Sequence, residues 1–105
     1  MDLLDFESVK KATHEILTRE GSNGRLDIPF NNAGTVARKS APLSAQQHEY
    51  HSCINSLGPF LLTRLLEPIL SQTARSAASG SVRVVRPASV MLEMNSPNGG
   101  IRREF

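Results

Sequence analysis

Leu26-Asp27-Ile28-Pro29-Phe30-Asn31-Asn32-Ala33-Gly34 is the stretch from which the fold of this chain is predicted. Its first five residues form a short apolar run, which is typical of a buried parallel strand. The Asn-Asn-Ala-Gly that follows tolerates unusual backbone dihedrals and leaves room for a ligand to approach. Ligands of open α/β sheets bind beyond the carboxyl ends of the strands. We therefore expect residues 31–34 to line a binding site, with an ordinary strand-to-loop turn as the alternative.

Helices and strands are expected to alternate on both sides of this stretch. Residues 1–4 are typical of the tail of a strand, and a helix should run from an N-cap at Asp5 to a stop at Gly21. A capping box, Ser44-Ala45-Gln46-Gln47, predicts the start of a long helix over 44–70. The next strand is expected at 82–85. The order strand, helix, strand, long helix, strand predicts a single α/β domain over residues 1–105.

Pro59 indicates a break in the long helix. In an α-helix the N–H of residue 59 would donate to the carbonyl of Asn55, but proline has no N–H. The Asn55 carbonyl should therefore be free to hold a water or a polar side chain, and the helix should bend there. A kink that only shapes the packing is the alternative interpretation.

Ser89 ends the run Val82-Arg83-Val84-Val85-Arg86-Pro87-Ala88-Ser89. A serine that follows a parallel strand places its hydroxyl at the same edge of the sheet as the Asn-Asn-Ala-Gly turn. The alternative is that Ser89 is a turn or cap residue, which is common after a strand.

Composition and charge exclude several classes of function. The net charge is only +2, and the basic doublets Lys10-Lys11 and Arg102-Arg103 form no stripe with aromatic residues, so no nucleic-acid partner is predicted. Residues 54–70 are too short and too polar to span a membrane, and residues 1–5 do not form a signal peptide. This composition is typical of a cytoplasmic protein.

Cysteine and histidine give no strong chemical signal. Cys53 is the only cysteine, so it forms no internal disulfide and is expected to pack as a small apolar residue. His48 and His51 lie three residues apart, which places two imidazoles on one helical turn. A zinc site needs two further ligands that the sequence does not offer, so no metal is predicted.

Three segments together resemble one enzyme family. Residues 26–34, 55–70 and 82–89 are similar, in order and spacing, to consecutive segments of the short-chain dehydrogenase/reductase family. The stretch Leu57-Gly58-Pro59-Phe60-Leu61-Leu62-Thr63 is especially similar to its retinol-dehydrogenase-type members. Residues 96–101 also resemble the loop that follows the family's serine.

The resemblance implies a partial Rossmann-like fold, a doubly wound parallel sheet. It implies hydride transfer between NAD or NADP and a small alcohol or carbonyl substrate. By the same resemblance, Asn55 and Ser89 match catalytic residues. The positions that match cofactor-binding residues are Asp2, Asn31, Asn32, Ala33 and Gly34.

Two motifs of the family are not found in this sequence. There is no Gly-x-x-x-Gly-x-Gly turn, which would bind the cofactor diphosphate. There is also no Tyr-x-x-x-Lys pair, because Tyr50 is the only tyrosine and no lysine follows Lys39. The chain is therefore expected to be an internal fragment, marginally stable and inactive alone. The alternative is a non-catalytic fragment that associates with a second copy through the long helix 44–70.

Overall fold

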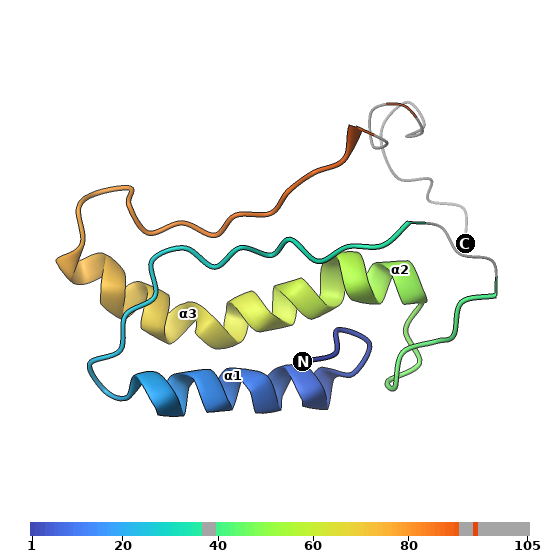
Figure 1. Ribbon diagram of the computed structural model, residues 1–105, viewed down its shortest axis with the longest axis horizontal. Coiled ribbons are helices and arrows are strands. Elements are labelled where there is room, and N and C mark those ends of the chain that lie inside the picture. Colours follow the sequence, from blue (N-terminus) through green and yellow to red (C-terminus); the bar gives the residue numbers. More distant parts are fainter. Residues whose placement is uncertain (37–39, 91–93, 95–105) are drawn as a thin grey trace.

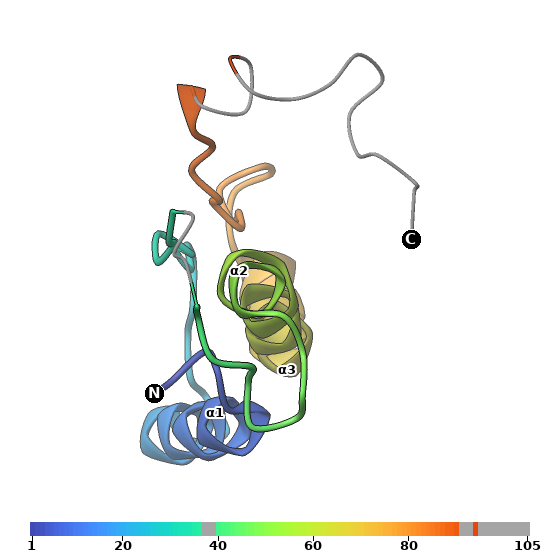
Figure 2. The same cartoon turned by 90° about the vertical axis from the view of Figure 1, so that its right-hand side faces the viewer.

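Helices are the only regular elements in the part of the chain that the computed structural model describes, residues 1–36, 40–90 and 94. They are α1 (Phe6–Glu20), the single turn α2 (Tyr50–Ser52), the π-helical turn η1 (Cys53–Leu57) and α3 (Gly58–Ser76). The last three follow one another without a break and form one rod. Figure 1 shows α1 and this rod running in the same direction, while segments 25–36 and 77–90 return the opposite way. The end-on view in Figure 2 places α1 below the rod, the first returning segment beside it and the second above.

The predicted sheet is absent from the described residues, so the assignment to a doubly wound α/β fold is wrong for them. Residues 1–4 contain a turn rather than the end of a strand. Segments 26–30 and 82–85 meet at one isolated parallel bridge, between Phe30 and Val85, and neither forms a named strand.

The two segments nevertheless lie side by side and run parallel at this bridge. Three backbone hydrogen bonds join them: Arg83 N donates to Asp27 O at 2.9 Å, Val85 N to Pro29 O at 3.0 Å, and Asn31 N to Val85 O at 2.9 Å. A single parallel pair without further strands is a weak structure. Pro29 removes one donor and Pro87 follows closely on the other segment, so the pairing does not extend into a ladder.

Helix α1 has the ends that the sequence predicts. The Asp5 side chain accepts a hydrogen bond from Glu7 N at 3.0 Å, which satisfies one of the free N–H groups of the first turn. Gly21 ends the helix with φ at 70°, a conformation that glycine adopts without strain, and its N–H donates to Leu17 O. These are local signals, which is why they could be found in the sequence.

The predicted start of the second helix at residue 44 is wrong, because the capping-box residues have other partners. Ser44 Oγ accepts from His48 N at 2.9 Å and forms a turn, with Gln47 in the left-handed region at φ 64°. Gln46 instead serves α1: its Oε1 accepts from Phe6 N at 3.0 Å and its Nε2 donates to Asp5. The helix begins at Tyr50 and is capped by Glu49.

The buried face of the rod differs from the predicted one by about one position. The helical spacing of apolar residues in the sequence predicts that the buried face consists of Tyr50, Cys53, Ile54, Leu57, Leu61 and Leu65. Cys53 is buried as expected, but the buried cluster consists of Leu66, Ile69 and Leu70, with Leu62 packed against it, and Leu57 is 37% exposed. A π-helical turn contains an extra residue, so the stripe that follows it is displaced along the sequence. The prediction is therefore correct for Cys53, at the start of η1, and incorrect for the residues that follow the turn.

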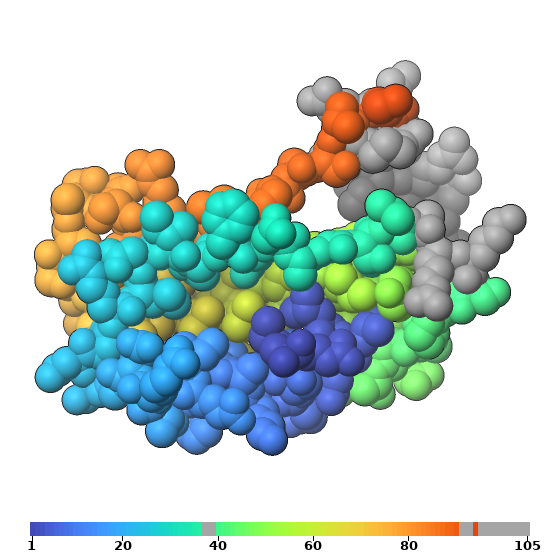
Figure 3. All heavy atoms as spheres, in the orientation of Figure 1, coloured from blue at the N-terminus to red at the C-terminus, as the bar shows by residue number. Residues whose placement is uncertain are grey.

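The core lies between α1, α3 and the starts of the two returning segments, and apolar side chains remain in solvent outside it. Ile16 and Leu17 of α1, Leu26 and Val82 pack against the cluster on α3. Along the face shown in Figure 3, segment 25–36 crosses the front of the molecule. Several large apolar residues are exposed: Ile28, Phe30, Leu57, Phe60 and Val84. An incomplete sheet leaves such surface uncovered.

The loop predicted at residues 95–100, and its similarity to the family's post-serine loop, lie outside the described residues. Among those that are described, no helix combines the length and the apolarity needed to cross a lipid bilayer.

Candidate functional site

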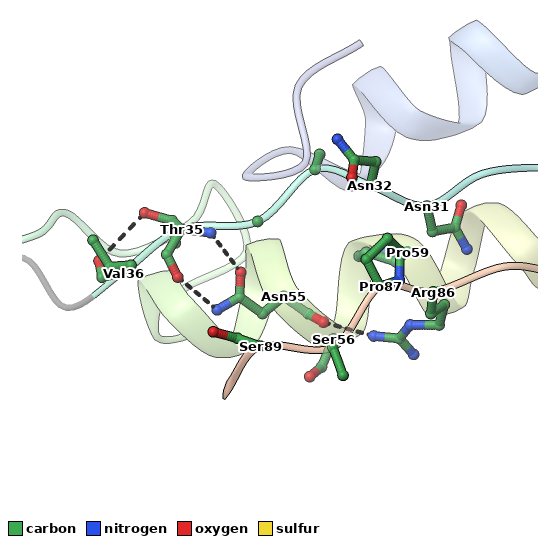
Figure 4. A pocket seen from close by; sticks show the side chains of 13 residues that line it. Asn31, Asn32, Thr35, Val36, Asn55, Ser56, Pro59, Arg86, Pro87 and Ser89 are labelled. Carbon is green, nitrogen blue, oxygen red and sulfur yellow. Dashed lines mark hydrogen bonds between the residues drawn. The ribbon is translucent and has the colours of Figure 1, made fainter. Parts of the chain in front are cut away.

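A pocket of about 790 Å³ lies where the two returning segments pass the beginning of the helical rod. Six of the predicted site residues line it: Asn31, Asn32, Ala33, Gly34, Asn55 and Ser89. The remaining lining residues are Thr35, Val36, Ser56, Pro59, Arg86, Pro87 and Ala88. Three regions that lie far apart in the sequence thus meet around one cavity, as Figure 4 shows.

The side chain of Asn55 holds the Asn-Asn-Ala-Gly turn against the rod. Its Oδ1 accepts from Thr35 N at 2.8 Å and its Nδ2 donates to Thr35 O at 3.0 Å, so one amide binds both backbone groups of one residue. Figure 4 shows this double contact. A Cβ on Gly34 would lie 3.4 Å from Asn55 Oδ1, which is an ordinary van der Waals contact. Asn55 is therefore a positioning residue for the wall of the pocket.

The backbone carbonyl of Asn55 is released from the helix and accepts a hydrogen bond from a side chain. Arg86 Nη2 donates to it at 2.6 Å. The release follows from Pro59, as predicted, and from the π-helical hydrogen bond between Gly58 N and Cys53 O that surrounds it. π-Helical turns are frequent at functional sites because they redirect backbone groups in this way.

Asn31 is anchored to α3. Its Nδ2 donates to Thr63 Oγ1 at 3.0 Å, and Thr63 Oγ1 donates to Pro59 O at 2.8 Å. A helical threonine commonly donates in this way to the carbonyl four residues earlier, and here the bond orients Oγ1 to accept from Asn31. Together with the Asn55 contact, this fixes both ends of the tetrapeptide to the rod.

Asp2 is separate from the other predicted site residues and does not line the pocket. Its Oδ1 accepts from Leu4 N at 2.9 Å and its own N–H donates to Ser8 Oγ. Its neighbours Met1 and Leu3 line a smaller hollow of about 70 Å³, which shares residues 31–33 with the main pocket. Asp2 therefore lies next to residues that contact segment 31–33 outside the main pocket.

Gly58 allows the N-terminal residues to pack closely on the rod. A Cβ there would lie 3.1 Å from both the carbonyl oxygen and a side-chain carbon of Leu3. The buried Cys53 donates its S–H to the same Leu3 carbonyl at 3.1 Å. This contact agrees with the expected packing role of Cys53.

Glu49 and His51 connect the start of the rod to the far wall of the pocket. The backbone N–H groups of His51 and Ser52, followed by the His51 ring, donate to the Glu49 carboxylate and lower its pKa to about 2. The other ring nitrogen of His51 lies 3.0 Å from Val36 O. The carboxylate is therefore ionised at neutral pH and orients the imidazole.

His48 and His51 do not converge on a common point. The His48 ring packs against Phe6 with ring centres 5.3 Å apart, whereas His51 contacts Glu49 and Val36. Over the described parts of the chain, no group of three acidic, histidine or cysteine residues is placed to hold a metal ion.

The sequence interpretation missed Thr35, Thr63 and Arg86. Thr35 forms hydrogen bonds with the side chain of Asn55, and Thr63 accepts one from the side chain of Asn31. Threonine in a loop or a helix gives no distinctive signal in the sequence. Arg86 differs from the apolar residues expected near the end of a buried strand, and this departure was the available sign.

Comparison with curated proteins identifies relatives that match almost the whole of this chain. A short-chain dehydrogenase/reductase of Phomopsis amygdali is 40% identical over 104 residues, which is 99% of this chain and 30% of the relative. One of Phaeosphaeria nodorum is 41% identical over 96 residues, 89% of this chain and 30% of the relative. An uncharacterised oxidoreductase of Schizosaccharomyces pombe is 37% identical over 101 residues, 96% of this chain and 28% of the relative.

The chain therefore belongs to the short-chain dehydrogenase/reductase family, as its motifs indicated. It spans about 30% of the length of the curated relatives that it matches. No protein-family model matches it, and no solved structure does.

Proposed function

We propose that this chain supplies the central part of the site of an oxidoreductase, which transfers hydride between NAD or NADP and a small alcohol or carbonyl compound in the cytoplasm. The observation that carries the proposal is the single pocket around Asn31–Gly34, Asn55 and Ser89. These are the positions that match the family's motifs, and the curated relatives are named dehydrogenases, reductases or oxidoreductases.

The donors and acceptors around the pocket fit the neutral parts of a nicotinamide cofactor. Residues 31–34 would face the adenosine side, where small residues and exposed peptide groups allow a ring to approach. The cofactor would supply the hydride, and the protein would supply orientation and hydrogen bonds. Asp2 would act at the edge of the adenine subsite.

Ser89 and Asn55 have separate proposed roles. The Ser89 hydroxyl would donate to the oxygen of the substrate and orient it, as the resemblance implies. Asn55 would hold the turn in place through Thr35. Its carbonyl accepts from Arg86 and, as the resemblance implies, would also order a water that relays a proton. A proton donor of suitable pKa contributes typically 10²–10⁴-fold to such a reaction. The sequence has no Tyr-x-x-x-Lys pair to provide such a donor, so we expect that the chain alone does not turn over substrate.

The test is the consumption of NADH and of NADPH by the purified chain with a panel of aldehydes and ketones, with Ser89→Ala as the matched variant. The expected result is no rate above background for either protein. A rate in the parent chain that Ser89→Ala abolishes would disprove the proposed inactivity and support the role of Ser89. A rate equal in both proteins would contradict that role.

A second candidate function is association with another copy of the chain through the long helical rod. Leu57 and Phe60 are exposed on the rod, by 37% and 61% of their surface. We expect the parent chain to elute as a dimer in gel filtration, and Phe60→Ser to elute later. A monomeric parent chain at high concentration would rule this function out.

A further inference from the structure

Arg86 is the one charged residue among the described residues that line the pocket. The other polar side chains there are amides and hydroxyls, and no described carboxylate contributes to the wall. The cavity therefore has a positive charge without a compensating negative one. A cleft with one uncompensated charge favours a ligand of the opposite sign.

The guanidinium of Arg86 is held in place by the backbone. Nη2 donates to Asn55 O at 2.6 Å, and Pro59 has no N–H to donate to this carbonyl. One of the five guanidinium N–H groups is thus used for positioning. A guanidinium positioned in advance loses less entropy when its remaining N–H groups bind a carboxylate.

Other arginines in the described residues show what is particular to Arg86. Arg25 binds Asp27 and Arg64 binds Glu67, so their charges are compensated locally. Arg83, three residues before Arg86, donates to the carbonyl of Gly80 at 2.6 Å but does not line the pocket. Both arginines are exposed and donate to a backbone carbonyl, and they differ in that Arg86 lines the pocket.

We infer that Arg86 binds the carboxylate of the substrate, so that the alcohols or carbonyl compounds accepted by this pocket are hydroxy acids or oxo acids. Arg86 and Ser89 line the same cavity. On this inference, a ligand whose carboxylate is close to its carbonyl would bind the guanidinium through the carboxylate, while its carbonyl oxygen would accept from the serine. This assignment of a substrate class rests on the proposed function.

The experiment is a titration of the isotopically labelled chain with pyruvate, followed through the backbone amide signals of residues 33–35 and 89. Methyl pyruvate is the neutral match, and inorganic phosphate tests a different anion. Arg86→Gln removes the charge, and Arg83→Gln is the control. We expect pyruvate to give saturable shifts, and Arg86→Gln to weaken binding roughly tenfold, as for the loss of a charge-assisted hydrogen bond. Arg83→Gln should leave the affinity unchanged.

Three results would overturn the inference. They are equal binding of pyruvate and its methyl ester, equal loss of affinity in both variants, and binding of phosphate but not of pyruvate. A purely structural Arg86 would change the response to acid and ester alike. The result of the NADH assay does not affect this measurement, because the titration measures binding and not turnover. The two proposals therefore fail in distinguishable ways.

Discussion

The helical layer and the two returning segments are held together by different kinds of interaction. In α1 and α3 the backbone hydrogen bonds join residues a few positions apart, and Leu66, Ile69 and Leu70 bury one face against α1. Segments 26–31 and 82–85 rely on three hydrogen bonds to one another and on side chains from the rod. The helices are thus stabilised locally, whereas the pocket wall depends on contacts between distant residues.

The largest expected effect comes from the helical layer. Leu66 is 4% exposed in the cluster on α3, and Leu66→Ala should lower the free energy of unfolding by about 2–5 kcal/mol through lost burial and a residual cavity. Urea unfolding followed by circular dichroism measures this loss. Leu57→Ala, at the more exposed site, should change stability by less than about 0.5 kcal/mol. Equal losses for the two variants would mean that the core is placed incorrectly.

The second prediction compares the helical layer directly with the two returning segments. Amide hydrogen exchange should be slowest in the middle of α3 and at least about tenfold faster at Arg83 and Val85. Their hydrogen bonds belong to a pair of segments with no further strand beside them. Exchange at Val85 as slow as at Leu70 would show that a more extensive sheet forms in solution.

The third prediction concerns the link between the layers. Asn55→Ala removes both hydrogen bonds to Thr35 and should cost about 1 kcal/mol, since these bonds are partly exposed. The Thr35 amide should then exchange faster. Asn55→Asp keeps the acceptor for Thr35 N and loses the donor, so its effect should be smaller. If alanine and aspartate behave alike, the donated bond to Thr35 O carries the contact.

The smallest effect is a pH dependence at the start of the rod. The pKa of Glu49 is about 2 in the folded chain, and an unperturbed glutamate has a pKa of about 4.3. Because the folded pKa is the lower one, the stabilisation is complete above about pH 4.3 and is lost as the pH falls toward 2. We expect the first turn, Tyr50–Ser52, to fray over this range, as followed by the amide signals of His51 and Ser52. Glu49→Gln should show no such transition.

Sequence reasoning was correct where the structure is stabilised locally and wrong where it depends on contacts between distant residues. Asp5 and Gly21 mark the ends of α1 because capping and left-handed turns are encoded within a few residues. The failures at 44–47 and at Leu61 and Leu65 arise from non-local causes. Gln46 is recruited by α1, and the π-helical turn displaces the buried stripe. The sheet was predicted from apolar runs, whose conversion into strands depends on partners that no local pattern reports.

The candidate site residues were predicted by motif, and their roles in binding and catalysis stay a prediction. Asn31–Gly34, Asn55 and Ser89 line one pocket, whereas Asp2 does not, and no named strand supports the pocket among the described residues. The expected release of the Asn55 carbonyl by Pro59 is confirmed by its contact with Arg86. The identity of that partner required the structure, because a freed carbonyl does not specify its donor.

The most direct test of the central claim, that these separated residues form the cofactor-facing part of a reductase site, is titration of the labelled chain with NADH. The account predicts weak but saturable shifts of the Ala33, Gly34 and Ser89 amides on one common binding curve, with the amides of α1 unmoved. Shifts that follow different curves, or that fall mainly on α1, would contradict it.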